Sequence, residues 1–378
     1  MQGNTSFNSA LRTQRTPLVI CFEDDHAGIK AMRVIAYATI LLVSLIGNSF
    51  VIGVLWQDRK MRKPVNYLIA NMAAADLAIT VVYMPRMISS VTRSYEWLAN
   101  GAIGLILCKI VPTLHLVSIK VSILTLVFLS VERLMAVSPL ARKKLKVRSV
   151  KIIICFIWLV STVVHVPNMY GLKLKSGLGG TKICGANLNK FFGSSKGRKI
   201  YDNVLAVIFY AIPLGLIVVL YTLAAVKLRR RIVRGVERFS DGNGRRKRQE
   251  KMNTNVFKML FAVTVTFICC WLSYFIMRKG VIGIRISCNV QFIRYFLAHC
   301  NSAITPCLYI IFGHKYRTSF KNILERMALR IPVRVRSSTT FSLISGRGSC
   351  GSLCPVSSPG ISLVRLDVVR EERALPKE

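Results

Sequence analysis

The sequence predicts an all-α membrane protein, in which a bundle of seven transmembrane helices is followed by a short amphipathic helix. Three observations carry this prediction. Hydrophobic residues make up 52% of the 378 residues, more than a soluble domain with a wetted surface needs. Seven stretches are long and apolar enough to cross a bilayer, and basic residues gather in every second segment between them.

Each predicted span has about 20 mainly apolar residues, the length that a helix needs to cross the hydrocarbon core. Lipid offers no partners for backbone N–H and C=O groups, so such a segment has to be helical. The spans are residues 31–56, 66–90, 104–136, 152–170, 200–226, 256–277 and 289–312. We expect residues 1–30 to form an N-terminal arm, 31–312 the transmembrane domain, 313–329 a helix on the membrane surface, and 330–378 a disordered tail.

The formal net charge of +38 follows this topology and does not indicate a nucleic-acid partner. If the N-terminus is outside, the cytoplasmic segments hold 33 Lys and Arg residues and the outer segments hold 14. This asymmetry is the positive-inside pattern of multi-pass membrane proteins. No apolar h-region precedes the first span, so we expect no cleaved signal peptide.

The outer face carries two further signals. Four of the 11 cysteines, Cys21, Cys108, Cys184 and Cys288, fall on or near it, where the compartment is oxidising and two disulfides can form. Asn4 begins the sequence Asn-Thr-Ser, a glycosylation acceptor in the N-terminal arm.

Polar side chains inside the spans indicate where function lies, because a charge at bilayer depth is costly unless it faces the bundle interior. Asp76 stands among apolar and small neighbours in "NMAAADLAIT" of the second span. Other spans offer oxygen atoms at Ser122, Asn301, Ser302 and Thr305. With Asp76 they predict a polar hub that binds water or a hard cation such as sodium.

One marker in each helix, all in order, resembles the rhodopsin-like (class A) G-protein-coupled receptors over about residues 30–320. The markers are Gly47 with Asn48, Asp76, Glu132 with Arg133, Trp158, Pro213 with Tyr221, Phe267 with Trp271, and Pro306 with Tyr309. The resemblance implies a plasma-membrane receptor that couples an extracellular ligand to heterotrimeric G proteins. It implies no enzymatic reaction and no cofactor beyond an allosteric sodium ion at Asp76.

The resemblance also implies roles for single residues. Glu132 would restrain Arg133 in the inactive receptor, and this pair would form the G-protein switch with Tyr221 and Tyr309. The residues that transmit the signal between the two faces would be Phe267, Trp271, Pro213 and Pro306. Disulfides are implied between Cys108 and Cys184 and, as in some peptide receptors, between Cys21 and Cys288.

Three positions depart from the family pattern. Leu134 replaces a tyrosine after Arg133, and Thr305 replaces the asparagine before Pro306. Ser273 stands where a proline normally kinks the sixth helix, so we expect a straighter helix or a kink made by the serine hydroxyl. These departures favour a rival interpretation, a non-signalling scavenger receptor that keeps the fold but has lost coupling.

The predicted ligand pocket excludes an amine ligand and retinal, because His115 and His299 replace the aspartate and the lysine that such receptors need. The two imidazoles either contact the ligand or are ordinary interior histidines. Other residues near the mouth of the bundle are Arg86, Lys109, Arg278, Arg294 and Tyr295. The positive charge of the four basic residues favours an acidic ligand. We expect a neuropeptide, with a small anionic ligand as the alternative.

The cytoplasmic tail predicts a second partner inside the cell. Ser337, Ser338, Thr339 and Thr340 are candidate phosphorylation sites for arrestin recruitment.

A transporter is a more distant alternative, since the seven spans show no inverted repeat.

Overall fold

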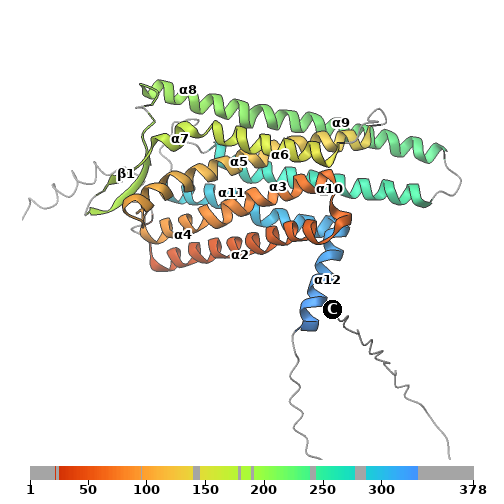
Figure 1. Cartoon of the computed structure of the whole chain (residues 1–378), viewed down its shortest axis with the longest axis horizontal. Coiled ribbons are helices and arrows are strands. Elements are labelled where there is room, and N and C mark those ends of the chain that lie inside the picture. Colours follow the sequence, from red (N-terminus) through yellow and green to blue (C-terminus); the bar gives the residue numbers. More distant parts are fainter. Residues whose placement is uncertain are drawn as a thin grey trace, which may run out of the picture. The chain divides into compact units, whose positions relative to one another are not determined.

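The computed structural model describes residues 22, 25–94, 96–138, 145–177, 180–188, 191–238, 244–276 and 287–330. Within these residues, seven segments are long and apolar enough to span a membrane, which confirms the predicted seven-helix bundle. They are α2 (Ala27–Gln57), α3 with η2 and α4 (Pro64–Ala78, Ile79–Tyr83 and Met84–Arg93), α5 (Gly101–Val137), α6 with α7 (Val147–Val163 and Val166–Gly171), α8 with η4 and α9 (Ser195–Ala206, Val207–Ala211 and Ile212–Arg238), α10 (Gly244–Ile276) and α11 (Cys288–Phe312). The helices run side by side (Figure 1).

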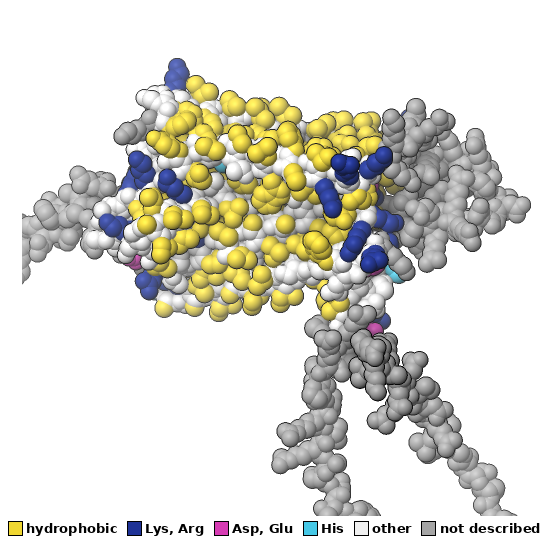
Figure 2. Space-filling view, viewed as in Figure 1, with side chains coloured by type: hydrophobic (Ala, Val, Ile, Leu, Met, Phe, Trp, Pro, Cys, Tyr) yellow, Lys and Arg dark blue, Asp and Glu magenta, His cyan; other side chains and the backbone are white. Residues whose placement is uncertain are grey.

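The outward faces of the helices are apolar, as a lipid environment requires. Ile46, Trp56, Ile103 and Phe156 are each 60% exposed or more. Figure 2 shows a continuous hydrophobic surface along the bundle, with Lys and Arg side chains gathered toward its two ends. An exposed apolar surface of this extent would aggregate in water, so it is the face that meets lipid.

The eighth helix, α12 (His314–Arg330), follows the last span, as the sequence predicts for the membrane-surface helix. Its aromatic face holds it to the bundle, since Phe320 contacts Phe50 of α2 and Tyr316 stacks on Tyr309 of α11. Burial raises the pKa of Tyr316, which therefore stays neutral. Gly313 allows the turn between the helices, because a Cβ there would lie 2.9 Å from the Tyr316 ring.

Two spans contain a π-helical turn, and both turns end two residues before a proline. The turn η2 ends at Tyr83, before Pro85, and η4 ends at Ala211, before Pro213. Proline has no N–H for the carbonyl four residues earlier, so the regular hydrogen-bond ladder is interrupted at these sites. The wider turns accommodate the interruption, and rare π turns of this kind often occur at functional sites.

A contact with Pro306 of α11 explains why Gly47 and Asn48 follow one another in α2. A Cβ at Gly47 would lie 2.6 Å from Cγ of Pro306 in α11, so only glycine lets the two helices approach this closely. Pro306 cannot donate to the Ser302 carbonyl, and Asn48 Nδ2 donates to that carbonyl instead, at 2.9 Å. Gly47 therefore makes room for the proline ring, and Asn48 satisfies the carbonyl that the proline releases.

A short antiparallel hairpin covers one end of the bundle. Strands β1 (Leu172–Ser176) and β2 (Lys182–Ala186) pair so that Leu174 lies opposite Cys184. A disulfide between Cys184 and Cys108 of α5 fastens the hairpin to the bundle, with 5.5 Å between the Cα atoms. Figure 1 shows the hairpin at the end away from α12.

Candidate functional site

The first group of predicted residues lies at the C-terminal end of α5. Arg133 is 7% exposed and forms an ion pair with the neighbouring Glu132. Tyr221 of α9 is buried, with its ring 5.8 Å from Phe257 of α10. A buried ion pair costs desolvation and stabilises the fold weakly, so its retention here favours a role in conformational specificity or switching.

The predicted polar hub joins α2, α3 and α11. Ser302 Oγ donates to Asp76 Oδ1 at 2.8 Å, and Asp76 is 1% exposed. Thr80 donates to the Asp76 carbonyl at 2.7 Å and shares a 2.6 Å hydrogen bond with Ser44, which connects the hub to α2. The Thr305 hydroxyl instead donates to the Asn301 carbonyl of its own helix, at 2.8 Å.

Among the described residues, several buried oxygen atoms of the bundle have no hydrogen-bond partner. They include Asp76 Oδ2, Ser122 Oγ, Asn301 Oδ1 and Asn48 Oδ1. A carboxylate, a hydroxyl and an amide carbonyl are the donors that hard cations prefer. The chemistry of the residues present therefore fits sodium.

The predicted transmission residues lie deep in the bundle. Phe267 and Trp271 stack one turn apart on α10, with their ring centroids 5.9 Å apart, and both are buried. Ser273 Oγ donates to the Cys270 carbonyl at 3.1 Å, the serine back-bonding that the sequence leaves open at this position. Pro213 is also buried, at the start of α9.

An aromatic cluster fills the bundle between Trp271 and the ends of the helices that carry the hairpin. We call it the outer cluster, and it comprises Tyr83, His115, Trp271, Tyr274, Tyr295 and His299. His115 Nε2 and His299 Nε2 share a hydrogen bond of 3.1 Å. Tyr83 stacks flat on His115, with 3.8 Å between centroids, because the η2 turn directs it toward α5.

Two predicted cations lie against aromatic rings. The Arg294 guanidinium is 4.7 Å from the Tyr295 ring and 5.1 Å from the Tyr274 ring. Arg86 lies 5.0 Å from the ring of Trp97, and Lys109 is half-buried on α5. Aromatic rings hold a guanidinium in place by cation–π attraction, and Arg86 is held further because its Nη1 donates to Ser89 Oγ at 3.0 Å.

One buried cation, Lys120, was not among the residues that the sequence predicts for the site. Lys120 of α5 is 3% exposed, and its Nζ donates to Tyr210 Oη at 2.7 Å. The signal was present, because Lys120 interrupts the apolar run "LVSIKVSIL" just as Asp76 interrupts the second span. Its partner was not predictable, because the η4 turn decides where Tyr210 lies.

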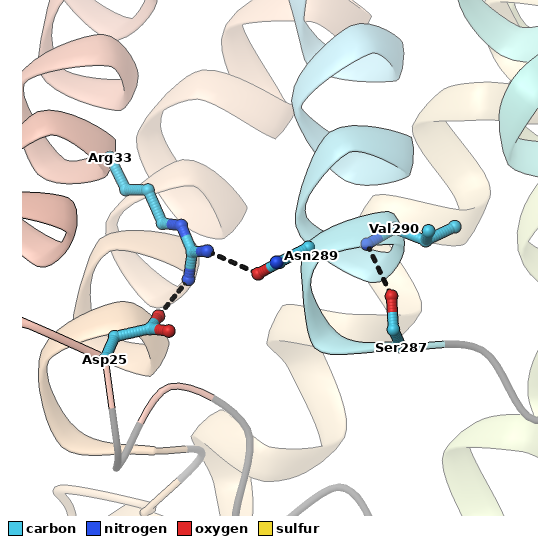
Figure 3. Close-up of polar contacts among 5 residues, drawn as sticks. All are labelled: Asp25, Arg33, Ser287, Asn289 and Val290. Atoms are coloured by element: carbon cyan, nitrogen blue, oxygen red, sulfur yellow. Dashed lines mark hydrogen bonds and ion pairs between the residues drawn. The ribbon is translucent and has the colours of Figure 1, made fainter.

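A polar seam, also unpredicted, joins α2 to α11 near their N-terminal ends. Arg33 forms an ion pair with Asp25 and donates to Asn289 Oδ1 at 2.7 Å (Figure 3). The same guanidinium lies 5.0 Å from the ring of Phe292. Figure 3 also shows Ser287, whose Oγ caps α11 by accepting from the Val290 N–H at 3.4 Å.

The remaining predicted residues lie outside the described part of the chain. They are Asn4, Cys21 and Arg278, together with Ser337, Ser338, Thr339 and Thr340 of the tail. Cys288, the expected partner of Cys21, is itself disulfide-bonded.

The comparisons with known proteins agree with this architecture. The family described as "7 transmembrane receptor (rhodopsin family)" matches residues 47–309. A QRFP-like peptide receptor of Branchiostoma floridae is 30% identical over 353 residues, which cover 89% of each chain.

Two further relatives are similar over most of their length. Neuropeptide FF receptor 2 of Rattus norvegicus is 25% identical, over 79% of this chain and 73% of its own. The RYamide receptor of Tribolium castaneum is 28% identical, over 76% of this chain and 79% of its own. The family match covers the residues that form the ion pair of α5, the polar hub and the outer cluster, except for Ser44. The chain therefore belongs to the rhodopsin family of seven-transmembrane receptors, which are multi-pass signalling proteins of the plasma membrane.

Proposed function

We propose that this receptor binds an extracellular peptide between the outer halves of its helices and activates a heterotrimeric G protein at its inner face. The observation that carries the proposal is similarity, over 76–89% of the chain, to receptors that are named for peptides. The same relatives favour a peptide over a small anionic ligand, and a signalling receptor over a scavenger.

The packing supplies a route between the two faces. A ligand in contact with the outer cluster would touch His115 and Tyr274, and Tyr274 lies 5.4 Å from Trp271. Trp271 stacks on Phe267, so displacement of either ring shifts α10 against its neighbours. Movement of α10 away from α5 would uncover Arg133 and open the inner face to the G protein.

The test measures G-protein dissociation in cells that express the receptor, challenged with a tissue extract before and after protease digestion. The proposal predicts a response that digestion abolishes. Arg133→Ala, with surface expression measured in parallel, should abolish the response without reducing the amount of receptor. Internalisation of bound ligand with no G-protein response in any arm would instead identify a scavenger.

The orientation in the membrane is part of the proposal. The excess of basic residues in the predicted cytoplasmic segments supports an extracellular N-terminus. With this topology Asn4 is glycosylated, and the tail recruits arrestin after phosphorylation. Loss of a glycosidase-sensitive mass shift in Asn4→Gln would support the topology, whereas its persistence or its absence in the wild type would count against it.

We further propose that sodium binds at Asp76 with Ser122 and Asn301. When bound there, the ion would supply positive charge to the buried carboxylate and would stabilise the inactive state. Replacement of sodium by N-methylglucamine at constant chloride should lower the melting temperature of the purified receptor. Asp76→Asn should remove the difference between the two salts, whereas an undiminished difference would exclude Asp76 as the ligand.

A further inference from the structure

We infer that the hairpin of β1 and β2 is a docking surface for a sulfated polysaccharide, and that Lys173 and Lys175 bind its sulfate groups. The polysaccharide would bind in addition to the peptide of the proposed function. The docking surface depends on the proposed orientation, in which the hairpin lies outside the cell, where such chains occur. The disulfide between Cys184 and Cys108 agrees with this side of the membrane, since disulfides persist in oxidising compartments.

The hairpin has two different faces, because successive side chains of a strand point to opposite sides. Leu172 and Leu174 belong to one face and pack in an apolar cluster with Val111 of α5. Lys173 and Lys175 belong to the other face, and both are exposed. The hairpin therefore presents a lysine face that is turned away from the bundle.

The strand opposite the two lysines leaves this face open. The register pairs Lys173 with Gly185 and Lys175 with Ile183, so these four residues share the lysine face. A Cβ at Gly185 would lie 3.8 Å from Cδ and Cε of Lys175 and 3.9 Å from its Nζ, so the Lys175 side chain extends across β2 beside the glycine. Both lysine side chains therefore lie around one residue that has no side chain of its own.

The charge along this part of the chain is entirely positive. Residues 171–199, which include the hairpin and the start of α8, hold seven Lys and Arg residues and no Asp or Glu. They supply half of the 14 basic residues in the predicted outer segments, and the positive-inside pattern gives no reason for cations on that side. In the described part of the chain, the ion pairs do not involve Lys173 or Lys175. A surface of this kind attracts a polyanion.

The hairpin is held in one position, so the lysine face is formed before a partner arrives. The disulfide joins β2 to α5, and the Trp97 N–H donates to the Lys182 carbonyl at 2.7 Å, which joins β2 to the segment before α5. On β1 the two lysines are separated by the rise of two residues, about 6.6 Å. A fixed pair of charges loses less conformational entropy on binding than a pair on a flexible loop.

The chemistry of the face favours a polysaccharide over an acidic protein. Protein interfaces depend on a buried core with apolar or aromatic anchors. The leucines of the hairpin are turned toward the bundle, and Ile183 is the apolar side chain that remains on the lysine face. A sulfated polysaccharide carries closely spaced negative charges along an extended chain and binds through them without an apolar pocket. Lysine suits such a partner, because its ammonium is a compact charge on a flexible stem.

The experiment measures the binding of a fluorescent heparin oligosaccharide to intact cells that lack their own glycosaminoglycans and express the tagged receptor. Intact cells offer the probe only the extracellular face, so basic residues inside the cell do not contribute. Binding per receptor at the surface should fall about 2- to 30-fold in Lys173→Gln/Lys175→Gln, the range that two exposed ion pairs supply. Lys173→Arg/Lys175→Arg keeps both charges and should retain most of the binding.

Arg148→Gln/Lys151→Gln is the matched control, since it removes two exposed charges at the opposite end of the bundle and should leave binding unchanged. Hyaluronan, which carries carboxylates and no sulfates, should bind more weakly than heparin. The inference would be overturned if the wild type bound no heparin, if Lys173→Gln/Lys175→Gln bound as well as the wild type, or if the control variant lost binding. Equal binding of hyaluronan would overturn the assignment to sulfate groups. Binding of a polyglutamate peptide without binding of heparin would identify an acidic protein segment as the partner instead.

The outcomes separate the docking surface from the proposed function. A protease-sensitive G-protein response in a receptor that binds no heparin would leave the proposed function standing and remove the docking surface. Heparin binding that depends on Lys173 and Lys175, in a receptor that never activates a G protein, would support the docking surface alone.

Discussion

Replacement of Gly47 by alanine tests the contact between α2 and α11 most directly. The new Cβ would lie 2.6 Å from Cγ and 2.7 Å from Cβ of Pro306, distances at which one of the two helices has to move. The same change at Gly53, two turns further along α2, meets no atom within 4 Å. Both positions are helical, so both variants gain the same helix propensity when glycine becomes alanine. The two variants differ only in the steric clash with Pro306.

The magnitudes follow from these two terms. Overpacking in a tight interior typically costs about 1–3 kcal/mol. Alanine in place of glycine within a helix gains about 1 kcal/mol. Gly47→Ala should therefore be neutral to about 2 kcal/mol destabilising, and Gly53→Ala about 1 kcal/mol stabilising. The difference of about 1–3 kcal/mol isolates the clash with the proline ring.

The assay is the apparent melting temperature of the purified receptor in detergent. At about 2–4 °C per kcal/mol, Gly47→Ala should melt about 2–12 °C below Gly53→Ala. Pro306→Ala removes the nearer ring carbon, so Gly47→Ala should cost less in that background than in the wild type. Equal melting temperatures for the two glycine variants would show that the close approach does not constrain the bundle.

Three further predictions address other contacts. Asn48→Ala should cost about 1–3 kcal/mol, because the Ser302 carbonyl loses its amide donor while staying buried, and an unchanged melting temperature would contradict this. Glu132→Gln should raise ligand-free G-protein activation per receptor at the surface, since the restraint on Arg133 weakens, and lower basal activity would refute the restraint. Cys184→Ser removes a disulfide that spans 76 residues and should lower the free energy of unfolding by up to about 4 kcal/mol. A variant that melts at the wild-type temperature without reductant would contradict this prediction.

Much of the fold was predictable because apolar length is a strong signal. The third span, for example, was expected over residues 104–136 and forms a helix over Gly101–Val137. The hairpin over one end of the bundle was not predicted. The residues of β1, Leu-Lys-Leu-Lys-Ser, do alternate apolar and polar side chains as a strand does, but those of β2, Lys-Ile-Cys-Gly-Ala, show no such alternation that would mark a partner strand. The π turns were also missed, although each lies just before a proline that marks it.

The candidate site was predictable where a residue is unusual for its surroundings and unpredictable where it depends on a partner. Asp76 and the histidine pair stand out within apolar spans, and the structure brings His115 and His299 together at 3.1 Å. The contact of Arg33 with Asn289 joins residues 256 positions apart, and no local pattern encodes it. Lys120 belongs to the first kind, because a charge within an apolar span follows the same rule as Asp76.

The π turns have a consequence for how this chain can vary in length. A deletion of one residue within an α-helix rotates everything beyond it by about 100°, so lipid-facing and interior residues would exchange places. Within η4 the surplus residue is already held as a bulge, and its removal returns the segment to an ordinary α-helix with the flanking faces preserved. Deletion of Ile208 should therefore leave more receptor at the cell surface than deletion of Ile123 from the middle of α5. The same deletion would withdraw Tyr210 from Lys120, so η4 is a position where a one-residue change in length can remove a buried hydrogen bond between two helices while sparing the rest of the bundle.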